Sequence, residues 1–414
     1  MRVNRNGNQE GLMDYLTKIK NGHLEEPPMF PEKPFYERIR CKRCLYDETT
    51  PAIQFDANGI CNYCKMYDQL DQEYQAGREG EVRLQEISEN IRRESGNKKY
   101  NVVVGISGGC DSSFLLYKTK MLGLKPLAVH FDNTWDSTIA VENIHHLLKK
   151  LDVDLFTYVV DNQEYDDIYR SFLRAGVPDI EAPTDIGLAT TLYMAADAYG
   201  IKYIFEGHSF RTEGVSPLGW LYMDGKYIES VQNRYGKYPL KTFPNLWLSS
   251  FLKWTAVKKI KKIRPLYFLN YQKEETKDFL TKEFGWKWYG GHHLENRFTC
   301  FYHTYFLPSR FGIDQRLNGY SALIRSGQMT RDEGMERMSE PPYVDPDLLE
   351  MVKRRLGFSN EEFEELMTQP KRTYKDFKTY KQTFERMRWF FWLLYKLDLV
   401  PKSFYIKYTS KKNI

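Results

Sequence analysis

The fold is decided by the stretch "VVVGISGGCDSS", Val102–Ser113. Its valines are typical of a buried strand, and the residues after Gly109 begin a helical pattern that ends at a glycine. A glycine-rich loop between a strand and a helix brings backbone N–H groups close to phosphate oxygens, and the helix N-terminus adds positive potential. The stretch therefore predicts a phosphate-binding loop in an α/β fold.

The residues that follow repeat this strand-and-helix alternation. Short apolar runs predict further strands in "KPLAVHFDN", "DLFTYVVD" and "IKYIFEGH", and amphipathic stretches between them predict helices, one of which begins at a Ser cap in "STIAVENIHHLLKKLD". Repeated units of this kind predict an α/β fold with a doubly wound parallel sheet, which binds ligands at the carboxyl ends of its strands. We expect those ends to be "GISGGCDSS", "HFDN" and "EGHS".

Two common phosphate loops are excluded by the residues present. No lysine follows Gly108 and Gly109, as a Walker loop requires, and Ser107 stands where a dinucleotide fingerprint has its second glycine. The remaining pattern, Ser-Gly-Gly-x-Asp-Ser after the first strand, resembles the PP-loop of the N-type ATP pyrophosphatase superfamily. A glycine turn with an acid near a helix start is the alternative.

That resemblance implies cleavage of ATP between its α and β phosphates, with transfer of AMP to a substrate oxygen and release of pyrophosphate. It implies a Mg²⁺ ion held by Asp111, whose carboxylate suits this ion. The histidines at the strand ends have an alternative, purely structural role. The implied nucleotide-binding residues are Gly105, Ser107, Gly108, Gly109, Asp111, Ser112 and Ser113 in the loop, His130, Phe131 and Asp132 after the second strand, and Gly207 and His208 after the fourth.

Four of the six cysteines form two close pairs before the loop. Cys41 and Cys44 are separated by two residues, as are Cys61 and Cys64, and sixteen residues lie between the pairs. This spacing predicts a four-cysteine zinc site in a zinc-ribbon-like module. Redox pairs are the alternative, but neither pair opens a helix after a strand. We expect a structural Zn²⁺ without an open coordination position.

The composition excludes several classes of protein. The chain has 414 residues, 42% hydrophobic content and a net charge of +5, which is too small a bias to predict nucleic-acid binding. No stretch is long and apolar enough for a membrane span or a signal peptide, so we expect a cytoplasmic protein. Residues 371–414 carry a local excess of cations and an aromatic run, "RWFFWLLYK", which predicts a buried helix with a basic rim. Docking of a partner or peripheral contact with an anionic membrane is the alternative.

Five units are expected along the chain. Proline-rich sequence begins it, and an aromatic, less regular region follows the sheet. We predict an extended arm at 1–37, the zinc module and a linking helix at 38–95, the nucleotide domain at 96–215, a substrate-binding region at 216–340 and a helical basic region at 341–414.

The region after the sheet carries the resemblance that suggests a substrate. "IRPL" followed by "KEE", then "YGGHHLENRFTCF", "FGIDQR" and "SGQMTRDE", together with the zinc cysteines, look like the N-acetyl sugar amidotransferase family of bacterial surface-polysaccharide pathways. The resemblance implies conversion of the acetamido group of a nucleotide-linked N-acetyl sugar to an acetamidino group, in lipopolysaccharide O-antigen or related biosynthesis. ATP adenylates the amide oxygen and ammonia displaces AMP.

Candidate residues for this chemistry lie on both sides of the "GG" turn. Lys262 and Arg264 are candidates for neutralising the phosphates, and Glu295 for accepting a proton from ammonium. A surface role is the alternative for each. The candidates for gripping the sugar are His292, His293, Glu295 and Arg297.

The source of ammonia is expected outside the chain. Cys110 and Cys300 are the cysteines outside the two pairs, and neither has the context of a glutaminase nucleophile. The resemblance implies a glutaminase partner similar to the histidine-pathway amidotransferase subunit, and a cyclase-like barrel that conducts ammonia. Two rival functions stay open: a PP-loop tRNA thiolase, and a non-catalytic nucleotide-binding scaffold.

Overall fold

The computed structural model describes residues 37–409 apart from positions 218, 292, 398 and 401. The predicted N-terminal arm lies outside the described residues except at its last position. The predicted sugar-binding residue His292 also lies outside them.

A five-stranded parallel sheet forms the centre of the molecule. Its order is β3-β2-β1-β4-β5, and Val102 of β1 is paired with Pro126 of β2. The four predicted strands are confirmed, and a short basic strand, β5, was not predicted because it has only three residues and no apolar run. The bounds are Val102–Gly105 for β1, Pro126–Asp132 for β2, Leu155–Val159 for β3, Tyr203–Phe205 for β4 and Lys261–Ile263 for β5.

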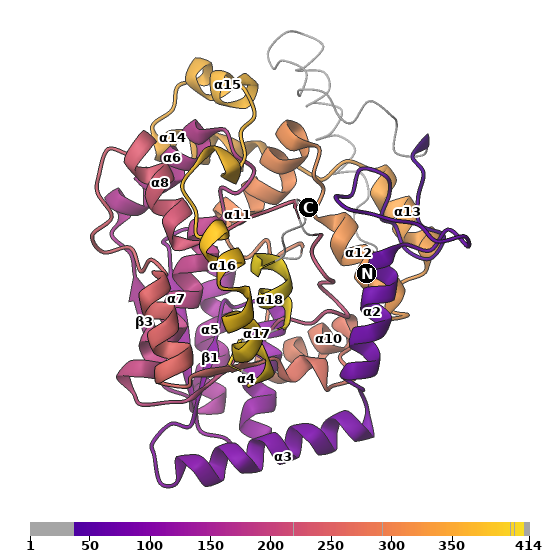
Figure 1. The fold of residues 1–414 in the computed structure, drawn as a ribbon, viewed down its shortest axis with the longest axis vertical. Coiled ribbons are helices and arrows are strands. Elements are labelled where there is room, and N and C mark those ends of the chain that lie inside the picture. The colour runs from indigo at the N-terminus through magenta and orange to yellow at the C-terminus, as the bar shows by residue number, and fades with distance from the viewer. Residues whose placement is uncertain (1–36, 218, 292, 398, 401, 410–414) are drawn as a thin grey trace.

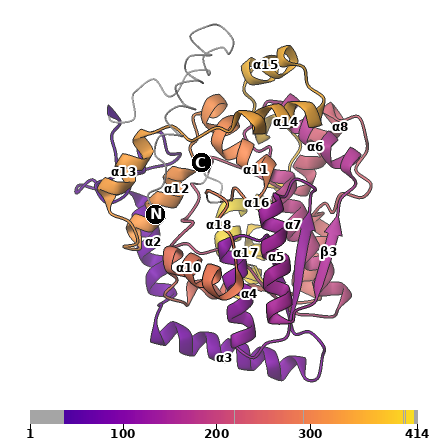
Figure 2. The ribbon, with the colours of Figure 1, turned by 180° about the vertical axis from the view of Figure 1, so that it is seen from behind.

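Helices cover both faces of the sheet, as the doubly wound prediction requires. Val102 and Val104 of β1 pack against α4 (Cys110–Met121), α5 (Thr138–Leu151) and α10 (Lys273–Phe284), which face the viewer in Figure 2. Val103 points to the opposite face and packs with α7 (Ala182–Ala198) and the C-terminal helices, which lie at the front in Figure 1. The alternation of side chains along a strand explains this division.

The sheet order places a switch point between β1 and β4. The chain runs from β1 outward through β2 and β3 and then crosses to β4 on the other side of β1. The connections after β1 and after β4 therefore diverge, and a crevice opens between them at the carboxyl ends of the strands. The Ser-Gly-Gly loop and the segment after Phe205 lie at this point.

The linking helix predicted within 38–95 is divided into two helices. The observed helices are α2 (Asn62–Glu73) and α3 (Arg78–Ser95), and Gly77 between them has a φ of +77°. At Gly80 a side chain would lie 2.0 Å from the Phe268 carbonyl oxygen. Glycine is therefore required where the start of α3 contacts the segment that contains Phe268. The predicted stop at Gly96 is confirmed.

The remaining elements are helical, and those near the C-terminus cover one face of the sheet. Figure 1 shows the Cys-rich N-terminal module and α2 beside α12 and α13, and Figure 2 shows the same neighbours from behind. The elements are α6 (Asn162–Ala175), α8 (Gly225–Tyr235), α9 (Leu248–Leu252), η2 (Lys253–Val257), η3 (Pro265–Tyr267), α11 (Arg297–Phe301), η4 (Tyr302–Phe311), α12 (Arg316–Arg325), α13 (Arg331–Ser339), α14 (Pro346–Leu356), α15 (Asn360–Thr368), η5 (Tyr374–Asp376), α16 (Lys381–Arg386), α17 (Arg388–Lys396) and α18 (Lys402–Thr409).

The helical C-terminal region is confirmed. Phe391 and Leu394 of α17 are buried against the sheet-covering core, as expected for a packed helix. Within the described part of the chain, no helix has the length and apolar character needed to cross a membrane. The five domain boundaries stay a prediction.

Candidate functional site

The phosphate loop is shaped by two glycines. Gly108 has a φ of +78°, and a side chain there would lie 2.3 Å from the Ala140 carbonyl oxygen. A side chain at Gly109 would lie 2.9 Å from Oε1 of Glu295. Positive φ and close approach both require glycine, so the loop has no room for another residue at either position.

The carbonyl of Gly108 is held away from the ligand side of the loop. It accepts hydrogen bonds from Nε1 of Trp286 at 2.9 Å and from Nδ2 of Asn143 at 3.2 Å. Asn143 also bonds both backbone groups of Lys287, at 2.8 and 2.9 Å. These contacts connect the loop, helix α5 and the segment after α10 into one rigid support.

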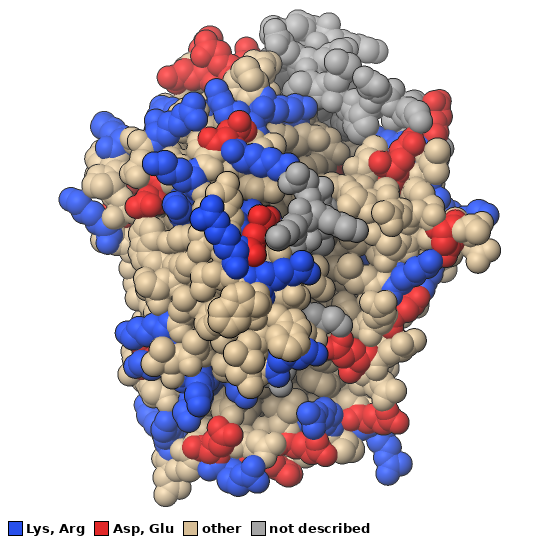
Figure 3. All heavy atoms as spheres, in the orientation of Figure 1, with Lys and Arg blue, Asp and Glu red and all other residues tan. Residues whose placement is uncertain are grey.

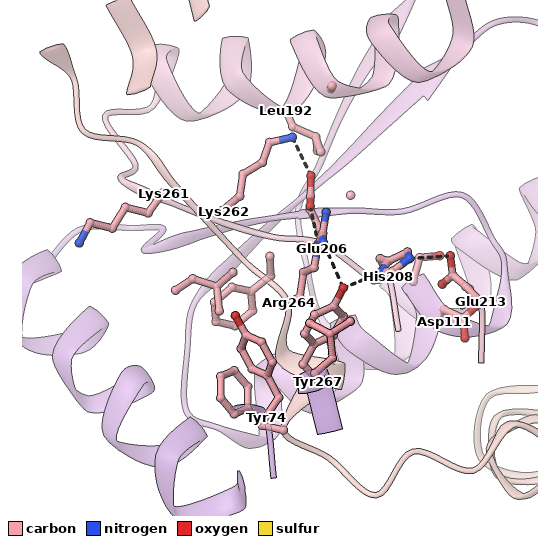
Figure 4. A pocket seen from close by; sticks show the side chains of 18 of the residues that line it. Tyr74, Asp111, Leu192, Glu206, His208, Glu213, Lys261, Lys262, Arg264 and Tyr267 are labelled. Carbon is pink, nitrogen blue, oxygen red and sulfur yellow. Dashed lines mark hydrogen bonds and ion pairs between the residues drawn. The ribbon is translucent and has the colours of Figure 1, made fainter. Parts of the chain in front are cut away.

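A large pocket opens at this loop, between the ends of β1 and β4. Its volume is about 1470 Å³, and Figure 4 shows side chains from several elements around it. Single small-molecule sites occupy about 300–1,000 Å³, so this pocket has room for two ligands. Predicted residues that line it are Gly105, Ser107, Gly109, Asp111, Ser112, Gly207, His208, Lys262, Arg264, His293 and Glu295.

A chain of polar contacts crosses the pocket wall (Figure 4). Glu206 accepts from Nζ of Lys262 at 2.6 Å and from Nε of Arg264 at 3.2 Å. Nη1 of Arg264 donates to the Tyr267 hydroxyl at 3.0 Å, and this hydroxyl lies 3.0 Å from Nδ1 of His208. Glu206 therefore partly neutralises the two cations that were predicted to meet the phosphates.

The protonation states along this chain follow from the charges. Burial favours the neutral form of Glu206, but the charges of Lys262 and Arg264 lower its pKa to about 2. Burial and the nearby Arg264 charge lower the pKa of His208 to about 3. His208 is therefore neutral, with Nδ1 accepting from Tyr267 and Nε2–H directed toward Glu213, whose Oε2 lies 4.0 Å away.

The carboxylates of Asp111 and Glu213 lie near each other beside the loop. Nζ of Lys273 lies 2.5 Å from Oδ2 of Asp111, and the Tyr271 hydroxyl contacts the other carboxylate oxygen. Glu213 lines the same pocket, and burial together with the Asp111 charge raises the pKa of Glu213 to about 7. Oxygen ligands of this kind suit Mg²⁺, so Asp111 and Glu213 are the residues of the pocket that would hold it.

Glu295 joins the loop from the far end of the sequence. Its Oε1 accepts a hydrogen bond from Oγ of Ser107 at 3.0 Å, and its side chain is buried. Its second oxygen, Oε2, is buried without a hydrogen-bond partner among the described residues. His293, two residues earlier, has Nε2 3.9 Å from Glu213. The turn predicted to direct these side chains inward thus brings both to the pocket.

Six predicted residues do not line the pocket among the described residues, and one of them is Gly108, whose carbonyl is held by Trp286 and Asn143. Ser113 is fully buried inside the fold, because α4 turns its side chain away from the loop. Arg297 opens α11, and its backbone N–H donates to the Trp135 carbonyl. The other three are His130, Phe131 and Asp132, which end β2 beside the pocket rather than in its lining.

His130 has a structural contact that explains its position. Its Nδ1 donates to the Ile106 carbonyl at 2.9 Å, and its Nε2 lies 3.1 Å from Oδ2 of Asp136. Burial opposes a charge on His130, but the hydrogen bond and charge of Asp136 raise its pKa. The pair thereby fixes the end of β2 against the residue before Ser107.

The four paired cysteines come together in the N-terminal module. Their sulfurs all lie within 4.8 Å of one another, with Cys41–Cys64 at 3.8 Å and Cys44–Cys61 at 3.7 Å. A tetrahedral zinc with Zn–S bonds of about 2.3 Å separates its sulfurs by about 3.8 Å. A four-iron cluster spreads its thiolates over separate irons, and hence farther apart. The donor set therefore fits a single structural zinc ion.

A buried arginine from α12 completes this cluster. Nη2 of Arg325 donates to Sγ of Cys44 at 3.1 Å, and its Nε donates to Sγ of Cys64 at 3.3 Å. The guanidinium also lies 4.5 Å from the centre of the Tyr46 ring. Four thiolates around Zn²⁺ carry a net charge of −2, and Arg325 offsets part of it.

Comparison with known proteins agrees with this architecture. Residues 295–390 match the family model described as "LPS biosynthesis protein WbpG-like, C-terminal domain". This region of the chain is therefore similar to that domain. Glu295, which bonds Ser107, stands at the first position of that domain. The preceding domain has the parallel sheet and the glycine-rich loop between a strand and a helix that the sequence predicts.

Sequence relatives cover different parts of the chain. Uncharacterized protein MJ1599 of Methanocaldococcus jannaschii is 22% identical over 320 residues, which are 77% of this chain and 99% of that protein. The tRNA-specific 2-thiouridylase MnmA of Proteus mirabilis is 28% identical over 136 residues, covering 29% of this chain and 37% of MnmA. The second match is thus confined to about a third of each protein.

Solved structures give only weak likenesses. The NH3-dependent NAD synthetase of Campylobacter jejuni aligns with a TM-score of 0.29 and 15% identity, over 70% of this chain and 97% of its own. The U34-tRNA thiolase NcsA of Methanococcus maripaludis aligns with a TM-score of 0.28 and 12% identity, over 80% of this chain and 89% of NcsA. Scores this low support no inference about function.

Several residues in the pocket or in contact with its lining were missed from the sequence. Lys273 is the first residue of "KEE", whose start after an apolar segment was a usable signal, and Glu213 follows the fourth strand in "EGHSFRTE". Glu206 directly follows β4. Asp185 and Lys407 had no such signal, because α7 and α18 approach the pocket only through packing.

Proposed function

We propose that the chain is an ATP-dependent amidotransferase. It converts the acetamido group of a nucleotide-linked N-acetyl sugar to an acetamidino group in lipopolysaccharide biosynthesis. One observation carries the proposal: Glu295, the first residue of the WbpG-like domain, bonds Ser107 of the phosphate loop. The sugar-pathway domain and the nucleotide loop thus share one pocket.

The proposed reaction has two steps. The amide oxygen attacks the α phosphorus of ATP, pyrophosphate leaves, and an adenylated imidate forms. Ammonia then adds to the imidate carbon and AMP departs with the former amide oxygen. Mg²⁺, when bound at Asp111 and Glu213, offsets the charge of the leaving pyrophosphate.

The chain's own groups position the reactants. The loop amides and the hydroxyls of Ser107 and Ser112 bind phosphate oxygens, and Lys262 and Arg264 add positive charge from the opposite wall. The free oxygen of Glu295 lies at the loop, where it accepts a proton from the attacking nitrogen. Holding both substrates in one cavity converts a bimolecular step into an effectively unimolecular one.

The far half of the pocket suits the sugar. Asp185 from α7, Lys407 from α18 and Met223, which comes between these helices in the sequence, line this half of the pocket. Burial raises the pKa of Asp185, while the charges of Lys407 and His293 oppose that rise. A carboxylate flanked by cations suits sugar hydroxyls, and Lys407 suits an acidic group of the carrier.

The proposed ammonia source is a glutaminase partner with an ammonia-conducting barrel. Cys110 and Cys300 do not provide a glutaminase thiol, since burial raises the pKa of each to about 11.

Incubation of the chain with ATP, Mg²⁺, ammonium and UDP-N-acetyl sugars tests the proposal. We expect sugar-dependent AMP and a product lighter than the sugar by about one dalton, because NH replaces O. Glu295→Gln should lower this rate by about 100-fold or more, whereas Glu283→Gln, on the exposed side of α10, should not. ADP as product, AMP without any acetamido sugar, or sulfur transfer to tRNA would contradict it.

A further inference from the structure

An aromatic and aliphatic strip runs along the outer face of α17. Trp389 is 73% exposed, Trp392 48%, Leu393 42% and Leu397 54%. Trp392, Leu393 and Leu397 follow Trp389 by three, four and eight residues, which places all four side chains on one side of the helix. Large apolar side chains gathered at this exposure are uncommon on a soluble surface and mark an interaction site.

The opposite face of the same helix is fixed in the protein core. Phe391 and Leu394 are buried and pack with Phe384 and Phe404 against the helices that cover the sheet. The helix therefore cannot rotate to bury its outer strip without losing this packing. The strip is a constant feature of the folded surface.

Cations lie along the strip, and the first acid after it in the sequence, Asp398, is outside the described residues. Arg386, Arg388 and Lys396 are exposed, and residues 386–397 contain no Asp or Glu. The nearest acid before them, Glu385, is paired with Lys381 at 3.4 Å. Figure 3 shows an uncharged area over α17 bordered by Lys and Arg side chains.

We propose that the α17 strip binds the surface of an anionic lipid bilayer. Trp and Leu side chains with flanking Lys and Arg are the features of helices that lie at the membrane interface. A helix of nine residues is about 14 Å long, far short of the ~30 Å hydrocarbon core, so α17 lies on the membrane rather than across it. The proposal is independent of the sugar chemistry proposed above.

A second copy of the chain fits this surface less well. A two-fold contact places the same patch on both partners, so cations would face cations with no acid among residues 386–397 to pair them. An anionic lipid surface supplies the opposite charge and also accepts the indole rings at its interface.

Vesicle co-sedimentation of the full chain tests the proposal. We expect binding to vesicles of phosphatidylglycerol with phosphatidylcholine, weakened by salt, and little binding to phosphatidylcholine alone. Arg386→Gln with Lys396→Gln should weaken binding roughly 25-fold, at about fivefold per cation. Trp389→Ser with Trp392→Ser should weaken it about tenfold or more, because their apolar area is no longer buried.

Matched variants on other faces provide the controls. Lys149→Gln with Lys282→Gln removes two exposed cations from α5 and α10, and Tyr343→Ser removes an exposed aromatic ring. Both should bind like the unmodified chain. Absence of binding to either vesicle, equal loss in the controls, or a dimer that Trp389→Ser with Trp392→Ser converts to a monomer would overturn the proposal.

Discussion

At the scale of single residues, the site is organised by cations placed against acids. Nζ of Lys273 lies 2.5 Å from Asp111, and Nζ of Lys262 lies 2.6 Å from Glu206; Asp111, Lys262 and Glu206 line the pocket. The charges of Lys262 and Arg264 keep Glu206 ionised in a buried setting. Arg325 has the same relation to the cysteine cluster, since it donates to two of the four thiolates.

Arg325→Met should weaken zinc binding about 10- to 100-fold, because groups that hydrogen-bond metal ligands commonly contribute this much. Arg337→Met is the matched control, as Arg337 is exposed and pairs with Glu333 on its own helix. Competition with a chromophoric chelator measures both affinities. Equal zinc affinity in the two variants would show that the hydrogen bonds of Arg325 do not contribute to zinc binding.

At the scale of elements, the phosphate loop depends on neighbours that are distant in sequence. Trp286 and Asn143 hold the Gly108 carbonyl, and Glu295 and Tyr289 pack on Gly109. The loop is therefore completed by α5 and by the segment after α10, neither of which belongs to its sequence signature.

Gly108→Ala should destabilise the fold by about 2 kcal/mol or more and abolish ATP binding. Its positive φ disfavours a side chain, and the new Cβ would overlap the Ala140 carbonyl. Gly319→Ala is the control, since Gly319 lies within α12 with open space around it, and should be neutral or slightly stabilising. Thermal unfolding and calorimetric ATP titration measure these effects. ATP binding by Gly108→Ala would contradict the assigned role of the loop.

At the scale of the whole molecule, the cysteine module connects the N-terminal part of the described chain to α12. Its cysteines share a core with Trp220 and with Leu317 of α12, and α2 behind them lines the pocket through Leu70 and Tyr74. The Tyr46 hydroxyl reaches Asn318 of α12 at 2.5 Å. The metal site therefore supports the pocket wall from a distance.

We expect one zinc ion per chain by elemental analysis, and a fall of roughly 5 °C or more in the unfolding temperature when a chelator removes it. Zinc addition should restore the unfolding temperature. Cys44→Ser should lose the metal, whereas Cys300→Ser, outside the cluster, should retain it. Iron with labile sulfide, or a metal-free protein of unchanged stability, would contradict a structural zinc site.

The sequence by itself determined the local features whose causes are local. The Ser-Gly-Gly loop, four of the five strands and the cysteine spacing each depend on residues within a short stretch. Backbone conformation, side-chain periodicity and ligand geometry act over such distances. Lys262, Arg264 and Glu295 were also placed at the pocket, although Glu206 as the partner of the two cations was not foreseen.

Only the tertiary structure decided which side chains meet. The contacts of Lys273 with Asp111 and of Arg325 with the thiolates join residues that are 160 or more positions apart in the sequence. Lys407, near the C-terminus, is likewise brought to the pocket by packing. It also turned His130 and Ser113 away from the pocket lining, and it left one face of α17 exposed where periodicity predicted a buried helix. These outcomes depend on packing between elements, and the energies of such packing are set by the whole fold rather than by any short stretch.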